Sequence, residues 1–301
     1  MEIRRLTAED YVQHNKVASQ SFIYECNIYE DKELPGEIML GAFQNGVLTA
    51  DMEIYNRLCN FDGGFLSCAA VGGVASKPEY RSMGAVRRLF SDLFAGNNLN
   101  FKPEISILYP FSEGYYRKFG YGSAGYSVSL TVPFTELSEM PKNTDVVLFE
   151  GKDENMLLSL YNKAALKNSL SFVRGDCRDF SAQPYAKAEY TYIHKDELGV
   201  YDAYATYTVD RKTGRVCVKE LNFTGREGLR GILGFLRCYE GNQSEIMFCA
   251  LPGDSPVFTC LKGAVHYSCS RSSVGAVRIL DAFSVLKKKK YPSGSGGFTL
   301  K

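Results

Sequence analysis

Apolar and polar residues vary along the chain with two periods, and each period predicts one type of element. Residues 1–6 alternate like a short strand, and Thr7, with an acid three positions later, is typical of the start of a helix that continues to about residue 22. Two apolar runs flank Asn45-Gly46, a strong hairpin signal. A further apolar strand covers residues 64–76. The expected order is therefore strand, helix, hairpin, strand.

A helix with one apolar face follows this strand. From Gly84 to Phe94 the apolar residues recur at the spacing of a single helix face, and residues 105–110 predict another strand. Strand, helix and strand in this order form a βαβ unit, so part of the sheet should be mixed or parallel. An alternating run at residues 126–134 predicts one more strand.

The second half repeats this order without visible sequence identity. The predicted elements are a strand at 146–151, a helix at 153–168, antiparallel strands between 190 and 223, a helix at 226–239 and a strand at 245–251. A new unit then begins with a strand and a short helix, and the chain stops early in it. The sequence predicts an α/β chain (α+β, mixed sheet) with three segments: 1–142, 143–275 and an apparently incomplete 276–301.

Composition narrows the classes of function. Hydrophobic residues make up 45% and charged residues 23%, and the net charge is +1. This even balance does not support a duplex nucleic-acid binder, which normally carries a basic excess. No run approaches the ~18 to 20 apolar residues of a membrane span, and the N-terminus has no apolar signal-peptide core. We therefore expect a cytoplasmic protein with neither a nucleic-acid nor a membrane partner.

Cysteine and histidine give little support to metal or nucleophilic chemistry. The nine cysteines are scattered without a CxxC pair or zinc spacing, as is typical of buried thiols in a reducing cytosol. Only three histidines are present, whereas tyrosines number 20. We expect no metal, and tyrosine becomes the candidate for moving a proton.

The turn between the strand at 64–76 and the next helix is the first candidate site. The first N–H groups of a helix have no intrahelical partner, and the helix dipole is positive there. Gly84 lets the backbone approach an anion, and Arg81 adds positive charge, so a phosphate or pyrophosphate is the natural ligand. The turn consists of Arg81, Ser82, Met83, Gly84, Ala85 and Val86.

Two motifs together resemble a known family. The turn resembles the R/Q-x-x-G-x-G/A motif of the GNAT acyl-CoA N-acyltransferases, although Val86 departs from its last position. SEGYYRKFGY at 112–121 resembles the SE-x-x-Y-x-[RK]-FGY signature of the Eis-type (enhanced intracellular survival) branch. The resemblance spans the chain in outline. It implies a GNAT domain, a degenerate second GNAT-like domain and the start of a sterol-carrier-like domain.

The resemblance also implies roles for individual residues. Acetyl-CoA would place its pyrophosphate on the turn and its pantetheine arm along the strand backbone at Val74 and Ser76. A backbone N–H there would polarise the thioester carbonyl. Ser112 matches a further cofactor contact, and Tyr116 matches the general acid.

A tyrosine suits that task on chemical grounds. Attack of an amine on the thioester expels a thiolate, which a nearby phenol can protonate, and such a transfer contributes ~10²- to 10⁴-fold. Tyr116 follows the apolar strand at 105–110, near its carboxyl end, where ligands gather in open α/β sheets. The competing interpretation is a packing aromatic beside Phe119 and Tyr121. Tyr115 is the alternative acid, one residue out of register.

The acceptor and the base are less defined. Five acids, with two tyrosines among them, lie in residues 23–38 and suit an aminoglycoside, polyamine or lysine-type amine, although a solvated loop has the same composition. In Eis-type proteins the C-terminal carboxylate of the third domain reaches the active site, and here most of that domain is expected to be missing. The base, and whether the chain is truncated, therefore stay open.

The leading prediction is an acetyl-CoA-dependent N-acetyltransferase that works by direct transfer in a ternary complex. The alternatives are a non-catalytic acyl-CoA-binding or lipid-carrier protein and a tRNA-dependent aminoacyl transferase, which the charge balance disfavours. The resemblance also implies a homo-oligomer, commonly a hexamer.

Overall fold

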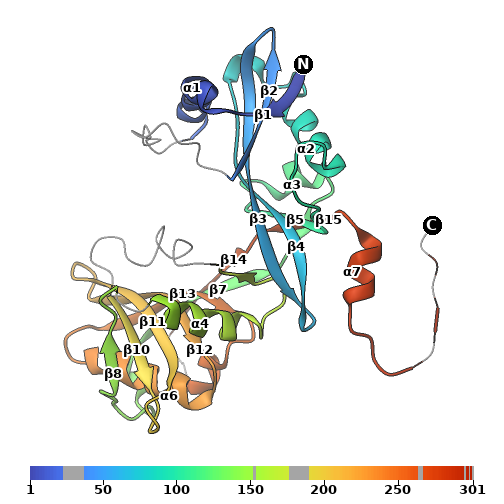
Figure 1. Cartoon of the computed structure of the whole chain (residues 1–301). Coiled ribbons are helices and arrows are strands. Elements are labelled where there is room, and N and C mark those ends of the chain that lie inside the picture. Colours follow the sequence, from blue (N-terminus) through green and yellow to red (C-terminus); the bar gives the residue numbers. More distant parts are fainter. Residues whose placement is uncertain are drawn as a thin grey trace. The chain divides into compact units, whose positions relative to one another are not determined.

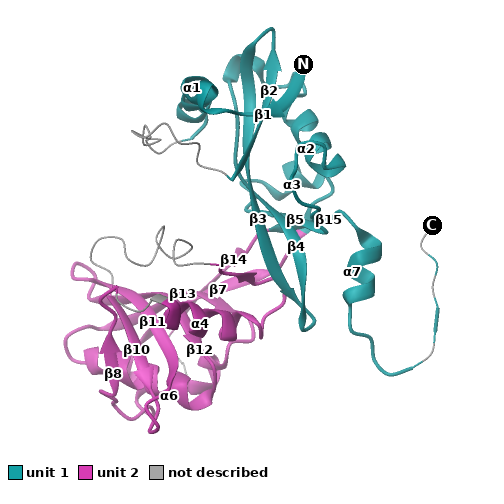
Figure 2. Cartoon of the chain, viewed as in Figure 1, with its two compact units in different colours: residues 1–122, 276–301 teal, residues 123–275 magenta. Residues whose placement is uncertain are grey.

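A computed structural model describes residues 1–22, 37–151, 154–175, 190–263, 267–294, 296–297 and 299 of the chain. The chain divides into two compact units, and the C-terminal segment belongs to unit 1 together with the N-terminal part (Figure 2). Unit 1 comprises 1–122 and 276–301, and unit 2 comprises 123–275. Each unit is built on a sheet that contains parallel and antiparallel pairs, which confirms the predicted mixed α/β class.

The sheet of unit 1 has the strand order β1-β2-β3-β4-β5-β15-β6 (Figure 1). Its strands are β1 (Glu2–Arg5), β2 (Ile38–Gln44), β3 (Val47–Phe61), β4 (Gly64–Ser76), β5 (Ile105–Leu108), β6 (Gly122–Ser123) and β15 (Ala276–Ile279). β2 and β3 form the predicted hairpin, in which Asn45 and Gly46 both have positive φ, 51° and 77°. β4 and β5 are parallel, which confirms the βαβ unit.

Helices α1 (Tyr11–Ser21) and α2 (Ala85–Ala95) cover the two faces of this sheet. Unit 1 also contains the short α3 (Glu113–Arg117) and α7 (Ala282–Lys288), with 3-10 turns at Ala8–Asp10 and Pro78–Tyr80. Side chains alternate along β3, so Met52 joins the core beneath α2, whereas Asp51 accepts a contact from His14 of α1. The helices α1 and α2 therefore lie on opposite faces.

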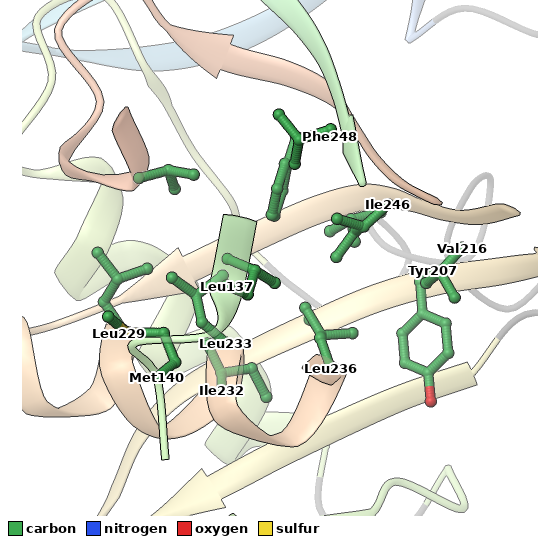
Figure 3. Packing of buried hydrophobic residues seen from close by; sticks show 14 of the residues in the cluster. Leu137, Met140, Tyr207, Val216, Leu229, Ile232, Leu233, Leu236, Ile246 and Phe248 are labelled. Carbon is green, nitrogen blue, oxygen red and sulfur yellow. The ribbon is translucent and has the colours of Figure 1, made fainter. Parts of the chain in front are cut away.

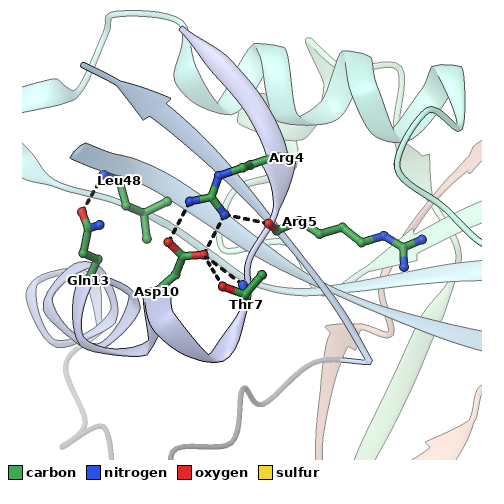
Figure 4. Close-up of polar contacts among 6 residues, drawn as sticks. All are labelled: Arg4, Arg5, Thr7, Asp10, Gln13 and Leu48. Atoms are coloured by element: carbon green, nitrogen blue, oxygen red, sulfur yellow. Dashed lines mark hydrogen bonds and ion pairs between the residues drawn. The ribbon is translucent and has the colours of Figure 1, made fainter. Parts of the chain in front are cut away.

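The start of α1 is fixed by an acidic side chain that the sequence pattern identified. Asp10 accepts two hydrogen bonds from the Arg4 guanidinium, at 2.7 and 2.8 Å, and one from the Thr7 backbone N–H at 2.9 Å (Figure 4). The Leu48 N–H donates to the Gln13 side chain at 2.9 Å. These contacts attach α1 to β1 and β3, and the predicted capping box is confirmed.

The sheet of unit 2 has the order β14-β7-β13-β12-β11-β10-β8. Its strands are β7 (Tyr126–Pro133), β8 (Val146–Leu148), β10 (Tyr190–Lys195), β11 (Tyr201–Asp210), β12 (Arg215–Phe223), β13 (Glu245–Pro252) and β14 (Ser268–Ser273). The two-residue β9 (Phe172–Val173) is not part of this sheet. The helices are α4 (Glu154–Ala165) and α6 (Arg226–Leu236), with 3-10 turns at Phe134–Leu137, Arg237–Tyr239 and Pro256–Cys260. The apolar face of α6, including Leu229, Ile232 and Leu233, packs on this sheet (Figure 3).

The two units share one topological element. In unit 1 an antiparallel strand pair is followed by α2 and a parallel strand, and in unit 2 β11 and β12 are followed by α6 and the parallel β13. This is the repeat order that the sequence pattern indicated.

The units do not divide where the predicted segments do. β7 pairs with β13 and β14, so residues 123–142 belong to unit 2 rather than to the first segment. β15 pairs with β5, so residues 276–279 lie in the sheet of unit 1. Alternation identifies a strand but not its partner, which is why the pattern misplaced both boundaries. A sterol-carrier-like third domain stays a prediction.

Candidate active site

The sheet of unit 1 opens where β4 extends beyond the end of its partner strand β5. The two strands pair from Cys68–Ile105 to Val71–Leu108, and there β5 ends while β4 continues to Ser76. Just beyond this point β4 carries a bulge, because its register with β3 passes from Gly72–Glu53 to Ala75–Asp51 with one extra residue. Gly73 in the bulge has φ +52°. The bulge re-aims the end of β4, as bulges beside active sites do.

The exposed edge of β4 beyond the bulge has a local partner. The Lys77 N–H bonds back to Thr49 of β3, whereas the Ser76 N–H bonds to the Ser21 hydroxyl at 3.2 Å. That hydroxyl also donates to the Ser76 carbonyl at 3.2 Å. The last residue of α1 therefore holds the backbone at which the pantetheine arm was expected.

The turn after β4 has the backbone that an anion site needs. Ser82 and Gly84 both have positive φ, 65° and 84°, and Gly84 is the N-cap of α2 without any side-chain cap. A Cβ placed on Gly84 would meet no heavy atom within 4 Å. The first-turn N–H groups of α2 thus keep their capacity to bind an anion.

A cavity of about 790 Å³ joins this turn to the end of β4 and the end of α1. Seven residues named from the sequence line it: Val74, Ser76, Arg81, Ser82, Gly84, Ala85 and Val86. The alternative acid Tyr115 and its neighbour Phe119 also line the cavity. The remaining lining residues were not predicted: Ser21, Phe22, Tyr80, Arg87, Phe111 and Lys118. Met83, which is exposed, and Ser112 are outside the lining.

The charged groups among the described lining residues all have one sign. Arg81, Arg87 and Lys118 line the cavity, and no carboxylate is found among the lining residues that the structure describes. Together with the positive end of α2, these cations favour a ligand with several negative charges. Arg87 was detectable in the sequence as a cation in the first turn of the predicted helix, and Lys118 as part of SEGYYRKFGY.

The signature segment forms α3 and places its two tyrosines differently. Ser112 is the N-cap of α3, and its hydroxyl accepts a hydrogen bond from the Tyr115 N–H at 3.3 Å. Tyr115 lines the cavity, whereas Tyr116 is buried, with 4% exposure. The Tyr116 ring lies 5.2 Å from that of Tyr115 and 5.5 Å from that of Phe111, so it contacts two side chains of the cavity wall.

Burial controls the protonation of both phenols. It raises the pKa of Tyr116 to about 12 and shifts the pKa of Tyr115 in the same direction. Both groups are therefore neutral at physiological pH and hold a proton that they can donate.

Part of the predicted acceptor wall lies outside the described residues. Of the five acids, Glu25, Glu30, Asp31 and Glu33 are in that part of the chain. The fifth, Glu37, pairs with Arg57 of β3 and accepts from the Asn56 N–H.

The described residues contain neither a cluster of metal ligands nor a membrane-spanning helix. No group of three or more His, Cys, Asp or Glu side chains there could hold a metal ion. No described helix is long and apolar enough to cross a membrane.

Comparison with known proteins assigns the first unit to a family. Residues 2–124 match the family described as "Acetyltransferase (GNAT) domain". Unit 1 carries a GNAT acetyltransferase domain. This span contains the bulged strand, the turn and α3, so the cavity lies wholly within the matched domain. No curated protein matches the chain.

Solved structures share the fold along almost the whole chain. A probable N-acyltransferase from Enterococcus faecalis V583 is 20% identical over 97% of this chain and 76% of its own, with a TM-score of 0.82. Eis1 from Mycobacterium abscessus is 19% identical over 98% of this chain and 78% of its own, with a TM-score of 0.78. A GCN5-related N-acetyltransferase from Kribbella flavida is 18% identical over 98% of this chain and 75% of its own, with a TM-score of 0.76.

These likenesses confirm the family prediction. The chain contains a GNAT acetyltransferase domain at residues 2–124, and its fold is that of the solved structures, among them Eis1. It spans about three quarters of the length of the structures that it matches. GNAT domains use acetyl-CoA as co-substrate. The family match therefore implies acetyl-CoA and a small-molecule acceptor.

Proposed function

We propose that this protein is an acetyl-CoA-dependent N-acetyltransferase whose acceptor is an amine of the aminoglycoside, polyamine or lysine type. The observation that carries the proposal is the cationic cavity at the start of α2, lined by seven residues expected to bind the co-substrate. The uncapped helix end and the cleared space above Gly84 suit a pyrophosphate.

The arm of acetyl-CoA would extend from the turn toward the open edge of β4. Val74 and Ser76 line the cavity there, and a backbone N–H of this edge would polarise the thioester carbonyl. Because Ser21 bonds to both backbone groups of Ser76, pairing with the arm at that residue requires the Ser21 hydroxyl to turn away. The loss is about one hydrogen bond, which the incoming amide groups can replace.

Transfer would be direct, within a ternary complex. The amine attacks the carbonyl carbon, the C–S bond breaks, and the departing thiolate takes a proton. Tyr116 is the proposed acid, supported by its match to the family signature and by a pKa that keeps it protonated. Tyr115, which lines the cavity, is the comparison residue.

The proposal includes expectations for metal, partners, cellular location and assembly. We expect no metal, no nucleic-acid partner, a cytoplasmic location and a homo-oligomer. Size-exclusion chromatography with light scattering tests the assembly, and copurified RNA would count against the absence of nucleic acid.

One pair of assays tests the proposal. Acetyl-CoA binding is measured by calorimetry, and CoA release is followed with a panel of aminoglycosides, polyamines and lysine peptides. Amine-dependent release is the expected result. Binding without release would favour the acyl-CoA-binding or lipid-carrier alternative, and absence of binding would refute the assignment of the cavity.

A further inference from the structure

A carboxylate lies against the bulge that opens the sheet of unit 1. Glu53 of β3 pairs with Gly72, and a Cβ placed on Gly73 would lie 2.5 Å from Cδ and 2.8 Å from Cγ of the Glu53 side chain. A Cβ on Gly72 would lie 3.1 Å from Glu53 Oε2. The two glycines thus make room for this carboxylate, one residue before Val74 enters the cavity wall.

The carboxylate faces the side of the sheet that carries α1. Side chains alternate along β3, so Glu53 shares a face with Asp51, which bonds to His14 of α1 at 2.8 Å. Met52 points the other way, into the core under α2. The phosphate-binding turn at the start of α2 and the Glu53 carboxylate are therefore associated with opposite faces of the sheet, on either side of the opening between β4 and β5.

The carboxylate is held by one donor. The Tyr55 hydroxyl donates to Glu53 Oε2 at 2.9 Å, and within the described residues no donor bonds to Oε1. Glu53 is partly exposed. Among the described residues, the ionisable groups on this face are Asp51, Tyr55 and Arg57 of its own strand and His14 of α1. Arg57 pairs with Glu37, and β4 places Gly72 and Gly73 against the carboxylate.

We propose that Glu53 is the general base that deprotonates the acceptor amine. The inference rests on the proposed function. The charged residues of the described cavity lining are all cations, so a protonated amine would be repelled from the α2 side and attracted to the face that carries Glu53. The base would lie on the α1 side of the sheet, and Tyr116 packs against Phe90 of α2 on the other. Attack and leaving-group departure would thus be served from opposite sides.

The protons balance in this scheme. Glu53 takes one proton from the ammonium and passes it to water, so that a neutral nitrogen forms the C–N bond. Breaking the C–S bond releases a thiolate, which takes a proton from the tyrosine. The nitrogen then loses its second proton, which restores the phenol through solvent. The net products are the amide, free CoA thiol and one proton in solution.

Three variants and a control test the base. In Glu53→Gln, kcat for amine-dependent CoA release should fall about 10²- to 10⁴-fold while the Kd for acetyl-CoA stays unchanged. Glu53→Asp, which keeps a shorter carboxylate, should retain part of the activity. Tyr55→Phe removes the donor that holds the carboxylate, so kcat should fall while the Kd for acetyl-CoA stays unchanged. Glu79→Gln removes an exposed carboxylate beside the lining residue Tyr80 and should behave as wild type.

The outcomes distinguish failure of the general-base assignment from failure of the proposed transferase function. Full turnover and an unshifted profile in Glu53→Gln, with an active wild type, would overturn the base and leave the transferase standing. Loss of acetyl-CoA binding in Glu53→Gln would mean that the carboxylate only holds the bulge, which also overturns it. A wild type that binds acetyl-CoA but never releases CoA with any amine would refute the proposed function itself.

Discussion

Gly84 offers a test in which backbone strain and ligand binding can be separated. Its φ of +84° costs an L-residue roughly 1–2 kcal/mol, and its Cβ would point into free space at the start of α2. Gly96, at the other end of the same helix, has φ +72° and equally free space. Alanine at either position should therefore destabilise unit 1 by the same amount, with a melting temperature about 2–8 °C lower per kcal/mol.

Only the substitution at Gly84 should change the affinity for acetyl-CoA. The added methyl would stand between a phosphate and the N–H groups of α2, and losing one hydrogen bond to a charged group costs about 1.5–3 kcal/mol. At 1.4 kcal/mol per tenfold, Kd should rise roughly 10- to 100-fold in Gly84→Ala. Calorimetry of both variants below their melting temperatures decides the matter. Equal Kd values for Gly84→Ala and Gly96→Ala would refute the phosphate-binding turn.

Three other predictions probe separate parts of the molecule. Tyr116→Phe should keep acetyl-CoA binding and lower amine-dependent turnover about 10²- to 10⁴-fold; unchanged turnover would exclude it as the acid. The Arg4 hydrogen bonds lower the pKa of Asp10, so this carboxylate stabilises the fold above the ordinary carboxyl pKa and less as pH falls through its own. Arg4→Gln should therefore lower the melting temperature at pH 7, with the difference shrinking toward about pH 3. In unit 2, Gly231→Ala would bring Cβ within 2.6 Å of His194 Cε1 and should cost about 1–3 kcal/mol without changing acetyl-CoA affinity.

Local signals predicted the elements of unit 1 well. The predicted strand 64–76 is β4, residue for residue, and the hairpin turns at Asn45-Gly46. The turn from Arg81 to Val86 leads into α2, as the change from an apolar run to helical spacing indicated. These features depend on neighbouring residues, so a single sequence carries them.

The same local signals could not predict which distant strands pair with each other. The alternating run 126–134 predicted a strand, but nothing in it says that β7 pairs with β13, more than a hundred residues later. The bulge at Gly73 was equally hidden, because it arises from the register between β3 and β4. Glu53 was missed as a candidate for this reason. It stands in an ordinary strand sequence, and only the bulge shows what it faces.

The second unit shows why a shared topology does not make a second acetyl-CoA site. Its α6 crosses from β12 to the parallel β13, as α2 crosses from β4 to β5. At the start of α6, however, a Cβ on Gly228 would lie 2.8 Å from the carboxyl carbon of Asp202. The first turn itself carries Arg226 and Glu227, whose charges offset each other. The chain's own carboxylate thus lies where a helix start attracts an anion, and a phosphate would be repelled. The carboxylate at the start of α6, which has no counterpart among the described residues of the cavity at the start of α2, therefore supports the proposal that unit 1 binds acetyl-CoA.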